Sequence, residues 1–139
     1  ETVVIFDPAR AWEFELRRKR SGHLFSKMRY VSAQAEAYLT DDLWLRLASH
    51  ANAMADRLGA GIMAIEGAEV TNTVEANMLF VRMRLAQHRR LVAAGATYYP
   101  TNGALDENGP DDAPWEVRLV TSFLTTEAEV DGFLAVMAG

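Results

Sequence analysis

The chain opens with a continuous apolar run, and this run constrains the fold more than any other feature. Thr2–Phe6 is made of β-branched and aromatic residues, which is typical of a strand covered on both faces in a parallel α/β sheet. Such a strand needs hydrogen-bonded neighbours, and parallel partners need long crossover connections. Because the run begins at residue 2, we expect a chain cut or processed from a larger α/β protein. A sheet-edge strand at a true N-terminus is the alternative.

The residues that follow favour helices. Asp7 and Pro8 are suited to the cap and the first position of a helix over 8–20, which ends in cations that complement its dipole. Apolar residues three and four apart predict a second helix over 24–39 and a third over about 40–60.

After residue 61 the pattern changes to β-β-α-β-β-α. We expect strands near 68–72, 78–83, 96–101 and 116–123, and helices near 84–94 and 127–137. Thr126 and Glu129 have the spacing of a capping box, and 101–114 is rich in turn formers and acids. This order fits a small α+β layer with a mostly antiparallel sheet.

Composition narrows the classes of function. The chain has no cysteine, which excludes a disulfide framework, a thiolate metal site and a cysteine nucleophile. With 14 cations, 19 anions and a net charge of −5, neither nucleic acid nor an anionic membrane is the expected main partner. No apolar run reaches membrane-spanning length and no signal peptide is visible, so we expect a cytoplasmic protein.

His23, His50 and His88 lack metal-ligand spacing; we expect surface or packing roles for them and no metal site.

The first cationic feature is the basic run Arg17–Arg20, which Lys27 and Arg29 continue. A solvated helix face accounts for such a run, and so does a site for a single phosphate. Nucleic acid is the weaker choice, because the net charge is negative and no base-stacking aromatics are interleaved.

The second cationic feature is Arg118. Strand alternation places Val117, Leu119, Thr121 and Phe123 on one face, with Arg118 on the other beside Glu116. A guanidinium in an apolar strand needs a partner. An internal acid such as Glu116 and the carboxylate of a ligand, which arginine grips through two hydrogen bonds, are equally good candidates.

Several blocks of the sequence resemble one family, the low-specificity L-threonine aldolases. The likeness begins at Phe6–Pro8 and is specific in residues 14–55 and 117–123, in the blocks Phe14–Tyr30, Ser32–Gln34, Asp42–Leu45, His50–Ala55 and Val117–Phe123. The likeness covers essentially the whole chain and is looser between about 60 and 114.

The resemblance implies an α/β fold of the fold-type I pyridoxal-phosphate class, of which this chain would be the C-terminal portion. Residues 1–22 would be the last strand and edge helix of the large cofactor-binding domain, 23–60 connecting helices, and 61–139 the small α+β domain with a short antiparallel sheet. The family's cofactor-binding lysine lies shortly before the strand that matches Thr2–Phe6. Lys19 and Lys27, the only lysines, do not align with it.

The resemblance also implies chemistry. The complete enzyme would use pyridoxal phosphate to cleave L-threonine or related β-hydroxy-α-amino acids to glycine and an aldehyde. Arg118 matches the small-domain arginine that holds the substrate carboxylate. Arg29, with Lys27 as the fallback, occupies the place of a cation that approaches the cofactor phosphate from a neighbouring subunit. The chain would hold no catalytic residue, would be inactive without the N-terminal part of the enzyme, and would act in a homodimer or homotetramer.

Two other readings stay open. One is a related pyridoxal-phosphate reaction on the same scaffold, either β-elimination or cleavage of phenylserine-type substrates. The other is a non-catalytic interaction or anion-binding module. A covered Thr2–Phe6 strand and an internally paired Arg118 would favour that module.

Overall fold

We describe residues 3–101 and 107–139 in a computed structural model. The chain divides into two compact units, Glu1–Trp44 and Leu45–Gly139. Thr2 and residues 102–106 of the expected 101–114 loop lie outside the described residues. Each unit is described separately below.

The N-terminal unit is helical, as its sequence predicts, but it has no core. Its elements are η1 (Pro8–Arg10), α1 (Ala11–Arg20), α2 (Met28–Leu39) and η2 (Thr40–Asp42). The Asp7 carboxylate accepts the Ala9 N–H at 3.0 Å and caps the first turn. Asp41 and Asp42 have φ values of 51° and 55°, and this left-handed pair breaks the helical conformation between α2 and the next helix. Not one of the described residues of this unit is buried.

The expected strand at the start of the chain is not formed. Val3–Ile5 has no regular secondary structure, and the Phe6 side chain is 93% exposed. The sheet assembled from the described residues does not include this segment. A strand is stable only beside a hydrogen-bonded neighbour, so an apolar run without one stays irregular.

The C-terminal unit has the expected β-β-α-β-β-α order. It contains α3 (Leu43–Met63) from Leu45 onward, β1 (Glu69–Val70), β2 (Met78–Arg84), α4 (Leu85–Ala93), β3 (Tyr99–Pro100), β4 (Pro114–Val120) and α5 (Glu127–Ala138). The strands form one sheet in the order β1-β2-β4-β3, and every neighbouring pair is antiparallel. The prediction of a small α+β layer with an antiparallel sheet is confirmed.

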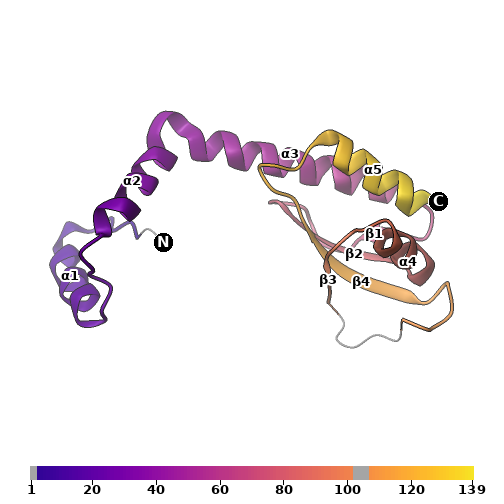
Figure 1. Cartoon of the computed structure of the whole chain (residues 1–139), viewed down its shortest axis with the longest axis horizontal. Coiled ribbons are helices and arrows are strands. Elements are labelled where there is room, and N and C mark those ends of the chain that lie inside the picture. Colours follow the sequence, from indigo (N-terminus) through magenta and orange to yellow (C-terminus); the bar gives the residue numbers. More distant parts are fainter. Residues whose placement is uncertain (1–2, 102–106) are drawn as a thin grey trace. The chain divides into compact units, whose positions relative to one another are not determined.

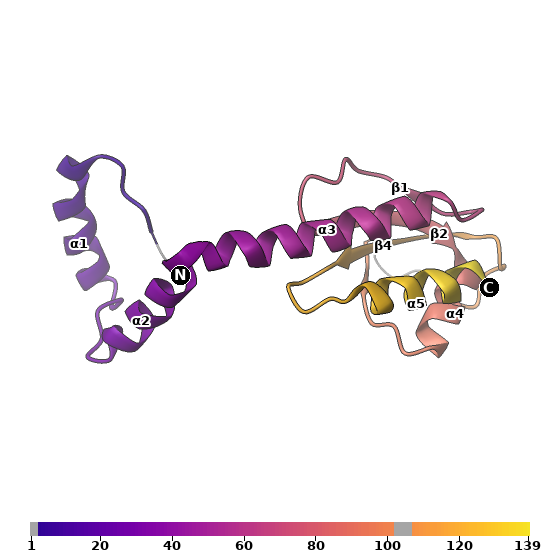
Figure 2. The same cartoon turned by 90° about the horizontal axis from the view of Figure 1, so that it is seen from above.

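Helices cover one face of this sheet (Figures 1 and 2). The alternating residues of β2 and β4 that point to this face are fully buried. They pack with side chains of α3, α4 and α5 in a single core. The core includes Ile62, Leu79, Val81, Met83, Leu85, Leu91, Trp115, Val117, Leu119, Val130 and Met137. The opposite face of the strands stays open, because their other residues are mostly exposed.

Helices α3 and α5 are tied together in two ways. The Arg57 guanidinium donates to both carboxylate oxygens of Asp131, at 2.9 and 2.8 Å. Gly61 faces Leu134 so closely that a Cβ at position 61 would lie 2.7 Å from Leu134 Cδ2. The absence of a side chain at Gly61 therefore sets how near the two helices approach.

One expectation about the last strand is wrong. Trp115, Val117, Leu119 and Thr121 are buried as alternation predicts, but the Phe123 side chain is 53% exposed. β4 ends at Val120, and the next residues turn. The Ser122 N–H donates to the Thr125 hydroxyl at 2.9 Å, so alternation no longer applies at residue 123.

Candidate functional site

Arg118 lies on the open face of the sheet, where the alternation of β4 places it. The flanking residues Val117 and Leu119 are buried under the helices, while Arg118 itself is exposed. The local sequence thus separates the two faces: apolar side chains anchor the strand, and the guanidinium projects away from the core.

Two aromatic residues lie opposite Arg118 in the neighbouring strands. Phe80 of β2 is its register partner on one side, and Tyr99 of β3 on the other. The Phe80 carbonyl accepts the Thr71 N–H, toward β1, so Phe80 and Arg118 form the closer, non-hydrogen-bonded type of pair. The Arg118 guanidinium carbon lies 5.8 Å from the Tyr99 ring centroid, within the range of a cation–π interaction.

Glu116, the internal acid that the sequence offers as one candidate partner for Arg118, pairs with another arginine. Arg82, the register partner of Glu116, donates from Nε to the Glu116 carboxylate at 2.9 Å. A second guanidinium nitrogen of Arg82 approaches the same oxygen at 2.8 Å, and Arg82 also binds Glu69 of β1. These contacts raise the pKa of Arg82, chiefly through its hydrogen bond to Glu116. Glu69, Arg82 and Glu116 form a row of charges across three strands, which we call the acid–arginine–acid row.

Because Glu116 pairs with Arg82, it does not occupy the Arg118 guanidinium. No carboxylate in residues 3–101 or 107–139 forms an ion pair with it. A guanidinium with a planar fork of donors, exposed on an open face and bordered by aromatic rings, suits a carboxylate ligand. Of the two partners that sequence reasoning left open, an internal acid is not found among the described residues, and the carboxylate of a ligand stays a prediction.

Two of the four cations of the basic run Arg17–Arg20 pair with acids of their own helix. Arg17 pairs with Glu13 and Arg18 with Glu15, three or four residues away on the exposed surface of α1. This arrangement favours a solvated helix face for that part of the run. Lys27 and Arg29 are exposed, and neither forms an ion pair within the part of the chain that we describe. The Arg29 guanidinium stacks on the adjacent Tyr30 ring, 4.8 Å from its centroid.

The histidines have packing or surface roles, as expected. His88 is buried, stacks on Trp115 at 4.3 Å and shares a 2.9 Å hydrogen bond with the Tyr98 hydroxyl. Burial lowers the pKa of His88 below 6.5 and raises the pKa of Tyr98 to about 12. His50 Nε2 contacts the Thr125 carbonyl at 2.7 Å, and His23 is exposed. The described residues contain no group of three His, Cys, Asp or Glu side chains placed to hold a metal.

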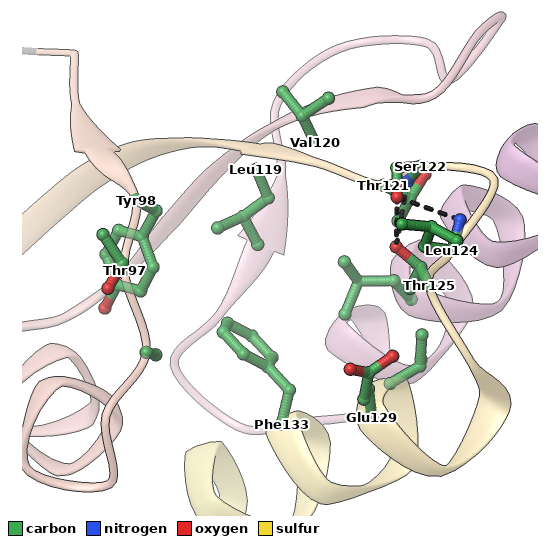
Figure 3. Close-up of a pocket in the computed structure, with 13 residues that line it drawn as sticks. Thr97, Tyr98, Leu119, Val120, Thr121, Ser122, Leu124, Thr125, Glu129 and Phe133 are labelled. Carbon is green, nitrogen blue, oxygen red and sulfur yellow. Dashed lines mark hydrogen bonds between the residues drawn. The ribbon is translucent and has the colours of Figure 1, made fainter.

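A cavity of about 440 Å³ lies on the helix-covered side of the sheet, between the segment before β3 and the start of α5 (Figure 3). Tyr98, Leu119 and Phe133 line it, and Arg118 does not. The Glu129 carboxylate at its rim accepts the Thr126 N–H at 2.8 Å, in the predicted capping box. The Glu129 carboxylate and the Ser122 and Thr125 hydroxyls are used in local caps and turns, so we do not assign the cavity a ligand.

Sequence comparison identifies the chain's relatives. It is 36% identical over 104 residues to the low-specificity L-threonine aldolase of Pseudomonas sp. (strain NCIMB 10558), and 35% identical over 99 residues to that of Pseudomonas aeruginosa. The chain is homologous to part of the low-specificity L-threonine aldolases. The matches cover 75% and 71% of this chain but only 30% and 29% of the relatives, so the chain spans about a third of their length. No protein-family model matches it.

Solved structures agree with this homology. The threonine aldolase of Leishmania major superposes with a TM-score of 0.61 and 26% identity, over 73% of this chain and 28% of that one. Serine palmitoyltransferase of Sphingomonas wittichii superposes with a TM-score of 0.50 and 16% identity, over 65% and 23%, which bears on the fold alone. Both are fold-type I enzymes, and the expected fold class is confirmed. In the described part of this threonine aldolase homologue, no helix is long and apolar enough to cross a membrane.

Proposed function

We propose that this chain is the C-terminal part of a pyridoxal-phosphate-dependent aldolase that cleaves L-threonine or related β-hydroxy-α-amino acids to glycine and an aldehyde. Arg118 carries the proposal: it is exposed, bordered by aromatic rings and not paired with a carboxylate among the described residues, as a substrate-carboxylate clamp must be. The names and coverage of the sequence relatives support the same conclusion.

The N-terminal unit supports a larger assembly. Its described residues bury nothing, and large apolar side chains such as Phe6, Trp12 and Phe25 are more than half exposed. Burying a side chain of that size is worth about 2 to 3 kcal/mol, so such a surface is stabilised when another part of the protein covers it. We propose that the preceding part of the enzyme and a second subunit, in a homodimer or homotetramer, cover it. A stand-alone module would instead bury this surface itself.

The chain's own residues fit two of the anionic groups in such a site. Arg118 would bind the substrate carboxylate and so fix the orientation of the substrate in the site. Arg29, or Lys27 in its place, would contact the cofactor phosphate, since both are exposed and free of acidic partners among the described residues. Pyridoxal phosphate itself supplies an electron sink for the carbanion that carbon–carbon cleavage leaves. The lysine that binds the cofactor would come from the part of the enzyme outside this chain. The cytoplasmic location stays a prediction.

The experiment compares variants of the complete enzyme that contains this chain. Arg118→Gln removes two charge-assisted hydrogen bonds to the substrate, and we expect a loss of about 10- to 100-fold in kcat/KM for L-threonine, with a raised KM. Arg84→Gln is the matched control: Arg84 lies on the same open face, four register positions away, and pairs with Glu66. If both variants behave like the wild type, Arg118 is not the clamp.

Product analysis separates the neighbouring reactions. Glycine and an aldehyde support the proposal, whereas ammonia and a keto acid indicate β-elimination, and a preference for phenylserine narrows the substrate class. The 139-residue chain mixed with pyridoxal phosphate should show no absorbance band of a lysine-bound cofactor. Such a band would show that the chain itself supplies the lysine.

A further inference from the structure

We infer that Arg82 is a positioning residue that keeps Glu116 away from Arg118 and so leaves Arg118 free to bind the substrate carboxylate. This inference rests on the proposed function and adds a residue to the same site. It comes from the way charges are arranged on the open face of the sheet, where Arg82, Arg118, Glu69 and Glu116 lie on three neighbouring strands.

The arrangement contains a competition. Glu116 and Arg118 are two residues apart on β4 and project from the same face, so their side chains are neighbours. Glu116 is also the less exposed of the two acidic partners of Arg82, with its side chain 29% exposed against 51% for Glu69. A partly buried carboxylate needs a cation. Arg82 supplies it from the directly opposite register position, while Arg118 lies opposite Phe80.

Arg82 contacts a carboxylate on each side, and the second contact helps to hold its guanidinium beside Glu116. Glu69 and Glu116 flank Arg82 from β1 and β4, so its guanidinium is held between two carboxylates. Without Arg82, the nearest cation on the same face for the Glu116 carboxylate would be Arg118. Glu69, on the far side of β2, is not next to Arg118 in the register.

The test uses the complete enzyme and four variants. Arg82→Gln should raise KM for L-threonine by up to about fivefold, the range of an exposed ion pair, with little change in kcat. Arg82→Gln/Glu116→Gln should restore KM, and Glu116→Gln should match the wild type. Arg82→Gln/Glu69→Gln has the same net charge as the restoring pair but leaves Glu116 in place, so it should keep the raised KM.

A second readout needs no catalysis. In the 139-residue chain, the NMR signal of the Arg118 Nε–H should follow the ionisation of Glu116 in Arg82→Gln far more than in the wild type. In Arg82→Gln/Glu116→Gln it should not respond. A wild-type KM in Arg82→Gln, or rescue by Glu69→Gln as well as by Glu116→Gln, would overturn the inference. An unchanged KM in Arg118→Gln would instead refute the proposed function.

Discussion

The close approach of α3 and α5 at Gly61 gives a prediction whose size follows from the structure. A methyl group at position 61 would lie 2.7 Å from Leu134 Cδ2 and 3.0 Å from Cγ, and closer still to Cδ1. Leu134 must then change its conformation or the helices must separate. Overpacking of this kind costs about 1 to 3 kcal/mol.

The chain offers a matched control on α5. Gly132 is exposed, and no atom lies within 4 Å of the place that an alanine methyl group would take there, so Gly132→Ala brings only the gain in helix propensity, about 0.5 to 1 kcal/mol. Gly61→Ala has the same kind of gain and adds the overpacking cost. The two variants should therefore differ in free energy of unfolding by about 1 to 3 kcal/mol, with Gly132→Ala the more stable.

Urea denaturation of the 139-residue chain measures both variants, provided that the slope with urea is unchanged. The contact itself is tested by a double variant: in a Leu134→Ala background, Gly61→Ala should lose its cost, because the clashing side chain is gone. Equal stability of Gly61→Ala and Gly132→Ala would refute the close approach. So would a cost that persists without Leu134.

Three further predictions concern single side chains. Burial lowers the pKa of His88, so on acidification the unfolded chain binds a proton at His88 before the folded chain does. The free energy of unfolding should therefore fall as the pH drops below 6.5. Denaturation at about pH 7.5 and about pH 5.5 should show a smaller fall for His88→Phe than for the wild type. Thr121→Val removes the 2.7 Å hydrogen bond from the buried hydroxyl to the Ala51 carbonyl and should cost about 1 kcal/mol in denaturation, whereas Thr121→Ser should cost less. Tyr99→Leu removes the ring beside Arg118 and should raise KM of the complete enzyme for L-threonine about two- to fivefold, while Tyr99→Phe should not.

Local patterns were sufficient to predict the elements of the C-terminal unit. The capping box at Thr126 and Glu129 marks the first turn of α5, and both of its hydrogen bonds are present. Alternation in β4 correctly separates the buried Val117 from the exposed Arg118. These features depend on neighbours within a few residues, which is why the sequence reveals them.

The opening run shows where local patterns stop being sufficient. The β-branched composition of Thr2–Phe6 indicates a preference for strand, but a strand also needs a partner of high sequence separation. Among the described residues the run has none, and Val3 and Val4 are 61% and 68% exposed. Likewise, the turn at Ser122 exposes Phe123 through side-chain hydrogen bonds that alternation does not represent.

The partner of Glu116 depends on register, which is the least readable property of a sheet from its sequence. A slip of β2 against β4 by two residues would leave every buried side chain buried, because the side-chain period of a strand is two. In one direction it would place Arg82 opposite Arg118 and Arg84 opposite Glu116, so the two arginines Arg82 and Arg118 would face each other. The observed register is held by a pair of long-range contacts at the strand ends: the Asn77 side chain donates to the Thr121 carbonyl at 2.7 Å, and the Thr121 N–H donates to the Asn77 carbonyl at 3.0 Å. Asn77 therefore contributes to the candidate site without touching it, since it aligns the strand that brings Arg82 to Glu116 and leaves Arg118 free.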